Sequence, residues 1–201
     1  MSLKYFVHVS SISNLSDARY CSGMMVDSLG FNLDENSTNK LEIESVKEIS
    51  QWINGVKLVA EFNNSSEKYI NKILEKEEFD AIQINYENNS KNINFDRNKV
   101  LVRISNPKMI KKESNDYLKK NFPEVEILII DNLSSKNINY LELINEKYMI
   151  LINPYEDINL ISNTLKNKNF GLLLKGSDEI RPGLKDYDAL SDLLESIDES
   201  F

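Results

Sequence analysis

The chain has 201 residues, of which 41% are hydrophobic and 28% charged, so it is long enough for one globular domain with a substantial core. Its formal net charge of −8 argues against a nucleic-acid-binding surface, because phosphate recognition needs clustered Lys and Arg. The single cysteine, Cys21, excludes an intramolecular disulfide and a cysteine metal cluster. Because the chain also has only one histidine, we expect no metal site and no cofactor.

The sequence shows no targeting or membrane segment. Its first residues lack a basic stretch followed by a long apolar run, and the longest apolar runs, such as Ile127–Ile130, are far too short to span a bilayer. We therefore expect a cytoplasmic protein with no membrane partner. No linker or shift in composition interrupts the chain, which predicts a single domain over residues 1–201.

Short apolar runs rich in Val, Ile and Leu alternate with longer stretches of helical period, a pattern typical of repeated strand-helix units. The expected strands are Tyr5–Val9, Val26–Leu33, Lys57–Phe62, Ala81–Asn85, Val100–Ile104, Val125–Asp131, Met149–Ile152 and Gly171–Leu174. The expected helices are Leu15–Ser22, Ile43–Ile53, Glu67–Glu77, Lys108–Asn121, Asn139–Lys147, Asp157–Lys166 and Tyr187–Ile197. The polar, Asn-rich segment Glu87–Asn98 indicates a loop or a stunted helix.

Eight such units in a chain of this length predict an α/β protein, a compact single-domain (β/α)₈ TIM barrel, whose lower size limit is about 200 residues. A doubly wound open sheet is the alternative. It needs a switch point and usually a glycine-rich first turn, whereas the first turn here, Ser10–Ser13, has no glycine.

Two polar side chains lie at the end of the first strand, where α/β folds collect catalytic groups. His8 and Ser10 are two residues apart, so they share one strand face at a Cα separation of about 7 Å. One hypothesis is that His8 accepts the hydroxyl proton of Ser10 and activates it. The alternative is a polar plug in the barrel interior without a catalytic role.

Further polar residues follow the ends of other strands. Asp131 ends an apolar strand, where a carboxylate must be paired or reach solvent. Arg103 and Glu61 are in frame to face inward, where they would pair with each other or with Asp131. Gln83 and Asn85 share one face of the fourth strand, and we expect them to be part of a polar interior layer.

A set of segments in order along the chain resembles the phosphoribosylanthranilate isomerase family, the barrel enzymes of tryptophan biosynthesis. The segments are His8–Ser13 with Asp17-Ala18, Asp27–Leu33, Glu61–Ser65, Asp80–Ile84, Val102–Ile104, Leu128–Asp131 and Glu179–Asp186. They correspond to family motifs such as Lys-Ile-Cys-Gly-Ile-Thr at the start and Glu-x-x-Pro-Gly-x-Lys-Asp at the end. Each motif is weak alone, and the ordered set over nearly the whole chain is more specific.

The resemblance implies catalytic roles for two of these residues. In the family, the first-strand Cys is the general base and the sixth-strand Asp the general acid of an Amadori rearrangement of an aminoaldose phosphate. Asp131 corresponds to the family's general acid, whereas Ser10 stands at the position of the family's Cys general base. A serine hydroxyl is no base at neutral pH without a partner, so we expect weak or lost activity, with His8 as the assisting group.

The resemblance also implies a binding site for a small phosphorylated or anionic ligand, with several family residues replaced. The family's Arg after the second strand is missing from Ser37–Lys40, its fourth-strand His is Asn85, and its Gly-Gly turn is lost around Pro154. The residues that remain for the ligand are Arg103, Gln83, Asn85, Lys175, Gly176 and Ser177. The last three would hold the phosphate through backbone amides and the lysine charge.

Because of these replacements, the sequence alone is compatible with three different functions. One reading is an isomerase with a degenerate active site. Another is a non-catalytic barrel that binds a small anionic ligand or a partner protein, with a second copy of the chain or an enzyme of the same pathway as candidate partners. A new reaction on phosphosugar-like substrates is the third.

Overall fold

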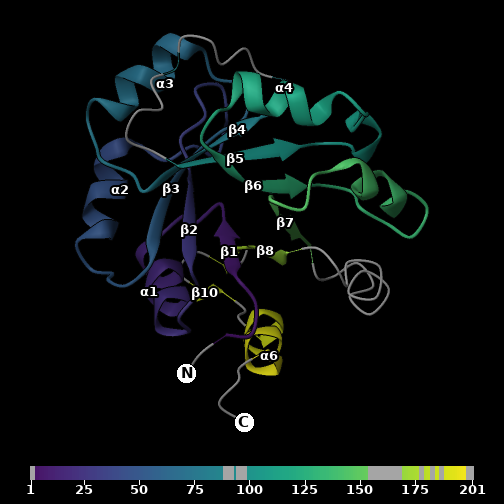
Figure 1. The fold of residues 1–201 in the computed structure, drawn as a ribbon. Helices are drawn as coiled ribbons and strands as arrows, with labels where there is room; N and C mark the ends of the chain where they lie inside the picture. The colour runs from purple at the N-terminus through teal and green to yellow at the C-terminus, as the bar shows by residue number, and fades with distance from the viewer. Residues whose placement is uncertain are drawn as a thin grey trace.

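A computed structural model describes residues 3–87, 93, 99–153, 169–176, 179–181, 184–185 and 188–197. Eight parallel strands close into a barrel in their order along the chain (Figure 1). They are β1 Val7–Ser10, β2 Ser28–Asn32, β3 Lys57–Phe62, β4 Ala81–Asn85, β5 Lys99–Ile104, β6 Val125–Ile130, β7 Met149–Ile152 and β8 Phe170–Lys175. Strand β1 pairs with both β2 and β8, which closes the sheet and confirms the predicted barrel over the open alternative.

Successive side chains of each strand alternate between the barrel interior and the surrounding helices. Inside the barrel, one apolar cluster consists of Val59, Ala81, Leu101, Ile129, Leu151 and Leu173. The residues between them in sequence belong to a larger core outside the strands, where residues such as Ala60, Ile82 and Val102 are buried with helix residues such as Ile70. Because each strand is buried on both faces, the strands read as nearly continuous apolar runs.

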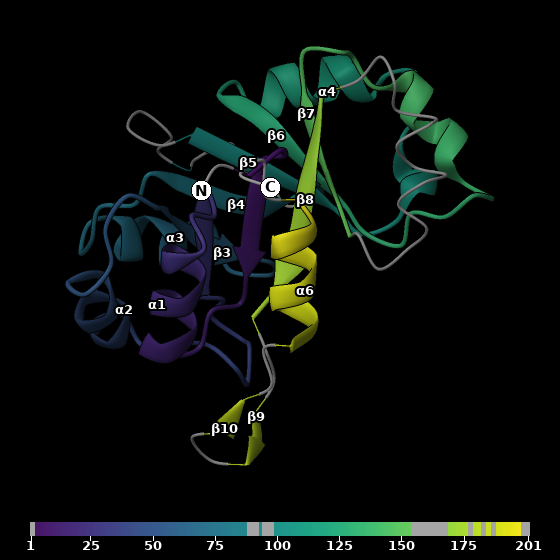
Figure 2. The ribbon, with the colours of Figure 1, turned by 90° about the horizontal axis from the view of Figure 1, so that it is seen from below.

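Helices lie outside the strands, as Figures 1 and 2 show. They are α1 Leu15–Gly23, α2 Ile43–Ser50, α3 Glu67–Leu74, α4 Ser114–Asn121 and α6 Asp188–Ser196. Side-chain caps explain two of the starts: Asn14 accepts a hydrogen bond from the Asp17 amide, and Ser66 accepts one from the Tyr69 amide. None of the helices in the described ranges is long and apolar enough to cross a membrane.

Two expected helices differ from the structure. The stretch Lys108–Asn121 is divided into the 3₁₀ turn η1, Pro107–Met109, and helix α4. In place of Asn139–Lys147 the structure has the 3₁₀ helix η2, Ile138–Leu143. The Asn145 side chain accepts a hydrogen bond from the Lys147 amide, and such local contacts compete with helix formation. The expected helix Asp157–Lys166 lies outside the described residues.

The chain ends with a small addition to the barrel. Strands β9 Glu179–Arg181 and β10 Leu184–Lys185 form an antiparallel pair, set apart from the eight strands in Figure 2, which the sequence analysis did not anticipate. Helix α6 then returns to the barrel. The Lys4 amide donates a hydrogen bond to the Ile197 carbonyl at 2.9 Å, so the two ends of the described chain meet.

Candidate functional site

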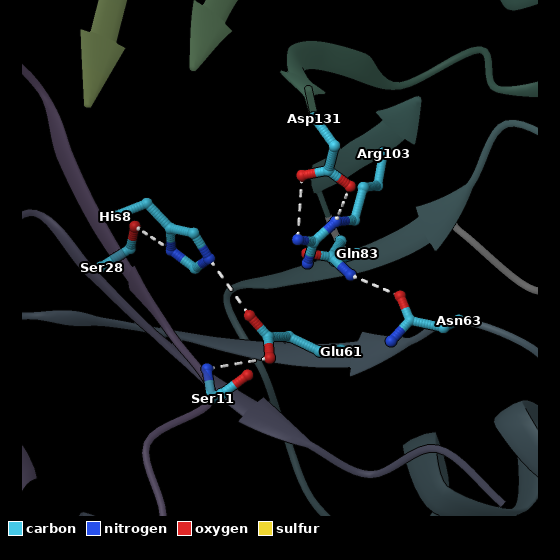
Figure 3. Close-up of polar contacts among 8 residues, drawn as sticks. All are labelled: His8, Ser11, Ser28, Glu61, Asn63, Gln83, Arg103 and Asp131. Atoms are coloured by element: carbon cyan, nitrogen blue, oxygen red, sulfur yellow. Dashed lines mark hydrogen bonds and ion pairs between the residues drawn. The ribbon is translucent and has the colours of Figure 1, made fainter. Parts of the chain in front are cut away.

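A layer of polar side chains lies toward the C-terminal ends of the barrel strands (Figure 3). From β3 to the end of β6 these residues come two positions after a member of the apolar interior cluster, because interior positions repeat every second residue. On β1, His8 comes two positions after Phe6, which packs against that cluster. The principal members are His8, Glu61, Gln83, Arg103 and Asp131. In (β/α)₈ barrels this end of the strands carries the active site, so the polar layer is the candidate functional site.

Arg103 and Asp131 form a two-pronged ion pair between β5 and the end of β6. The Arg103 Nε and Nη2 atoms donate to the two carboxylate oxygens of Asp131 at 2.7 and 3.0 Å. Burial alone lowers the pKa of Arg103, but the hydrogen bond and charge of Asp131, together with the charge of Glu61, outweigh it and raise that pKa above its ordinary value. The guanidinium is therefore a fixed positive charge in the layer.

Glu61 reaches from β3 toward β1 and contacts a different set of groups. Its Oε1 lies 3.3 Å from His8 Nε2, and its Oε2 accepts the Ser11 amide hydrogen at 3.1 Å. The other ring nitrogen, Nδ1, lies 2.9 Å from the Ser28 hydroxyl. A carboxylate only accepts hydrogen bonds, so Nε2 carries the proton toward Glu61. Both ring nitrogens of His8 thus have partners other than the Ser10 hydroxyl.

Gly30 on β2 makes the contact between β1 and β3 geometrically possible. A Cβ atom at this position would overlap Glu61 Oε1 and lie 3.0 Å from His8 Cε1. Strand β2 runs between β1 and β3 in the barrel, and a side chain on its inner face would separate them. The absence of a side chain at Gly30 therefore lets two residues from non-adjacent strands meet.

The β4 side chains bring unused hydrogen-bonding capacity to the layer. The Gln83 Nε2 donates to Asn63 Oδ1 at 3.2 Å. Within the described part of the chain, Gln83 Oε1 and Asn85 Oδ1 are buried without a hydrogen-bond partner. Buried acceptors of this kind favour a ligand or water with hydrogen-bond donors.

The turn that follows β1 contains no glycine, and a serine takes the left-handed backbone conformation there. Ser11 has a φ of 57°, the left-handed region, at the position where the resembling family motif has Gly. Its amide donates to Glu61, which helps to hold this conformation. Ser10 is buried and lies beside Lys175 of β8 in the register. Its carbonyl accepts a hydrogen bond from the Gly176 amide at 3.0 Å.

That last contact bears on the expected phosphate site. The Gly176 amide is already used by the Ser10 carbonyl, and the Gly176 position lies close to the buried carboxylate of Asp17, whose Oδ2 would be 3.3 Å from an added Cβ. A nearby negative charge disfavours a phosphate. Lys175 is exposed at the end of β8. Ser177, the third expected phosphate residue, lies outside the described residues.

Some partners in this layer were not anticipated from the sequence. They are Ser28, which contacts His8 from β2, and Asn63, which contacts Gln83 from the end of β3. The inward orientation of Ser28 could have been predicted from its position in the strand, because it shares the inner face of β2 with Gly30. Among the residues that the structure describes, no group of three or more His, Cys, Asp or Glu is arranged to hold a metal ion.

Comparisons with known proteins identify the family of this barrel. The family model described as N-(5'phosphoribosyl)anthranilate (PRA) isomerase matches residues 7–196. No curated protein sequence matches the chain.

Solved structures share the fold at low sequence identity. A phosphoribosyl anthranilate isomerase from Thermus thermophilus is 18% identical over 94% of this chain and 96% of its own, with a TM-score of 0.70. A TrpF from Jonesia denitrificans is 13% identical over 96% of each chain, with a TM-score of 0.72. Monomers generated from the dimeric isomerase of Thermotoga maritima are 18% identical over 96% of this chain and 98% of theirs, with a TM-score of 0.69.

Proposed function

Because this chain belongs to the N-(5'-phosphoribosyl)anthranilate isomerase family, we propose that it is a cytoplasmic member whose Amadori rearrangement of an aminoaldose phosphate is weak or lost. The observation that supports this proposal is the identity of the residue at the position of the general base. Ser10 occupies it, and the chain's only histidine is bound to Ser28 and Glu61 instead. A serine hydroxyl without a proton acceptor removes a carbon-bound proton very slowly.

The acid position supports the same conclusion. Asp131 would donate a proton to the ribose ring oxygen, so that the ring opens before the C2′ proton is removed. Its carboxylate accepts two hydrogen bonds from Arg103, so Asp131 must lose at least one of them and take up a proton from solvent before it can protonate a substrate. In any remaining reaction, Asp131 is the acid and Ser10 takes the base position, and His8 could aid Ser10 only after its ring leaves Ser28 or Glu61.

The ligand in this proposal is a small phosphorylated or anionic molecule bound at the C-terminal end of the barrel. Arg103 supplies a positive charge, and the unpaired oxygens of Gln83 and Asn85 accept hydrogen bonds from hydroxyl or amine groups. Lys175 with residues 176 and 177 would take the phosphate. Since the Gly176 amide is occupied, we expect phosphate affinity to depend mainly on Lys175.

The direct test is turnover of phosphoribosylanthranilate, followed by the loss of substrate fluorescence. We expect the native chain to show little turnover and the Ser10→Cys variant to gain at least tenfold in rate, because a thiolate is accessible at neutral pH. Asp131→Asn in the Ser10→Cys background should abolish the gain. Efficient turnover by the native chain, or a Ser10→Cys variant no faster than the native chain, would contradict the proposal.

A second candidate is a non-catalytic barrel that binds a small anion or a partner protein. The occupied Gly176 amide and the nearby Asp17 carboxylate favour it, since both oppose the phosphate grip that an isomerase needs. A ligand-induced rise in melting temperature with no turnover, even in the Ser10→Cys variant, would support this candidate. Because the isomerase of Thermotoga maritima is dimeric, the mass of this chain in solution should be measured in the same experiment.

A further inference from the structure

A cavity of about 470 Å³ lies at the opposite end of the barrel from the polar layer. Its lining includes the first residues of β3, β5 and β7, which places it at the N-terminal ends of the strands. The apolar part of the lining consists of Phe6, Val59, Ala81, Val100, Leu101, Ile127 and Met149. The volume lies within the range of small-molecule sites in proteins.

Three lysines line the same cavity. Lys57 is the first residue of β3, Lys99 the first residue of β5, and Lys147 lies two residues before β7. All three are exposed, whereas the apolar lining residues Val59, Ala81 and Leu101 are buried. The cavity therefore has an apolar inner part and a charged outer part, in which the three lysines stand against two carboxylates, Asp80 and Glu126.

Two of these three lysines form no ion pair with the acidic residues that line the cavity. Glu126 pairs with Lys99 at 2.6 Å, and an oxygen of Asp80 accepts the Leu58 amide hydrogen at 2.8 Å. In the described ranges, neither Lys57 nor Lys147 forms an ion pair with a carboxylate. The Lys147 ammonium lies 4.5 Å from the centre of the Tyr148 ring, a contact that leaves its charge in place.

A buried hydroxyl adds a polar group to the cavity lining. Ser28 is 2% exposed, and its Oγ lies 2.9 Å from His8 Nδ1. The same histidine contacts Glu61, so the cavity is connected to the polar layer through one side chain.

We propose that this cavity is a second binding site, for a small amphipathic anion: a short aliphatic or aromatic body that carries one carboxylate or sulfonate. The body would pack on the apolar lining, and the anionic group would lie between Lys57 and Lys147. Charge complementarity selects an anion, and the apolar inner part excludes a polyhydroxylated sugar phosphate. The site is thus chemically distinct from the one at the C-terminal end and does not depend on the proposed isomerase lineage.

The test uses the full chain and the fluorescent anion 1-anilinonaphthalene-8-sulfonate, with octanoate and 1-octanol as competitors. We expect octanoate to displace the probe at a concentration at least tenfold lower than 1-octanol, because only octanoate carries the charge that the lysines recognise. The double variant Lys57→Gln/Lys147→Gln should raise the octanoate Kd at least tenfold. The variant Ala81→Leu, which narrows the apolar part, should weaken octanoate as well.

The matched control removes the same charge elsewhere: Lys68→Gln/Lys72→Gln on helix α3, two exposed lysines away from the cavity. This control should leave octanoate binding unchanged, and inorganic phosphate should not displace the probe. Circular dichroism establishes that each variant is folded. Equal displacement by octanoate and 1-octanol, or equal effects of the two lysine pairs, would overturn the proposal. Neither result depends on turnover of phosphoribosylanthranilate.

Discussion

Two polar side-chain pairs occupy the same polar layer of the barrel, and they differ in their access to solvent. His8 and Glu61 are 0% and 3% exposed, and their remaining polar atoms are bound by Ser28 and the Ser11 amide. Arg103 and Asp131 are 25% and 23% exposed, and their contact lies at the open end of β5 and β6. One pair is enclosed by the protein, and the other faces the space that a ligand would enter.

This difference separates structural from chemical roles among residues of similar type. A buried hydrogen-bonded pair stabilises a fold only while both partners are present, because a buried polar or charged group without a partner is costly. A partly exposed pair contributes less to stability and can exchange its partner for a ligand. We therefore expect stability to depend on His8 and Glu61, and ligand binding to depend on Arg103 and Asp131.

The largest effect is expected from Glu61→Ala. The substitution leaves the His8 ring nitrogen and the Ser11 amide without their acceptor in a buried site, so the free energy of unfolding should fall by about 3 kcal/mol or more. Urea unfolding followed by circular dichroism measures it. A loss no larger than that caused by Asp131→Ala would remove the distinction between the two pairs.

The next largest effect is expected from Gly30→Ala. The added methyl group overlaps Glu61 Oε1, and overpacking of this kind costs about 1–3 kcal/mol. In the Glu61→Ala background only the 3.0 Å approach to His8 Cε1 remains, so the same substitution should cost less than in the native chain. A double-mutant cycle by urea unfolding measures the coupling. Strictly additive effects would contradict the close approach of the Glu61 side chain to Gly30.

A smaller effect is expected from Asp131→Asn. The amide keeps the shape of the carboxylate and loses its charge, so the unfolding free energy should fall by about 1 kcal/mol, as for partly exposed pairs. Binding of a carboxylate or phosphate probe should tighten severalfold, because Arg103 loses its internal anion. Calorimetric titration with inorganic phosphate tests this prediction. The control is Lys99→Gln, because Lys99 lies on β5 like Arg103 but outside the polar layer. Unchanged or weaker phosphate binding would argue against the idea that Arg103 can exchange Asp131 for an anionic ligand.

The smallest effect concerns pH. Because the pKa of Arg103 in the folded chain lies above its ordinary value, the stability it contributes is fully present below that ordinary value and is lost only as the pH rises through the folded-state pKa. The coupling energy between Arg103 and Asp131 should therefore be the same at pH 7 and pH 10. A cycle of Arg103→Gln and Asp131→Asn, measured by urea unfolding at both values, tests it. A fall in coupling by pH 10 would contradict the raised pKa.

Much of this architecture follows from the sequence by itself. The alternation of apolar runs and helical stretches predicted the barrel, and strand periodicity predicted that His8, Gln83 and Arg103 face inward. Three strand ranges, those of β3, β4 and β7, agree residue for residue with the expected ones. Helix prediction failed for Asn139–Lys147, because side-chain contacts of Asn residues with the nearby backbone are not visible as an apolar period.

The pairing inside the barrel was decided only by the tertiary structure. From the sequence, Arg103 had Glu61 and Asp131 as equal candidates, and His8 had Ser10. The barrel places Arg103 on β5 beside β6, within reach of Asp131, and the missing side chain at Gly30 lets Glu61 pass β2 to reach His8. Periodicity along one strand determines which face a side chain takes, but its partner depends on the neighbouring strands and the space between them.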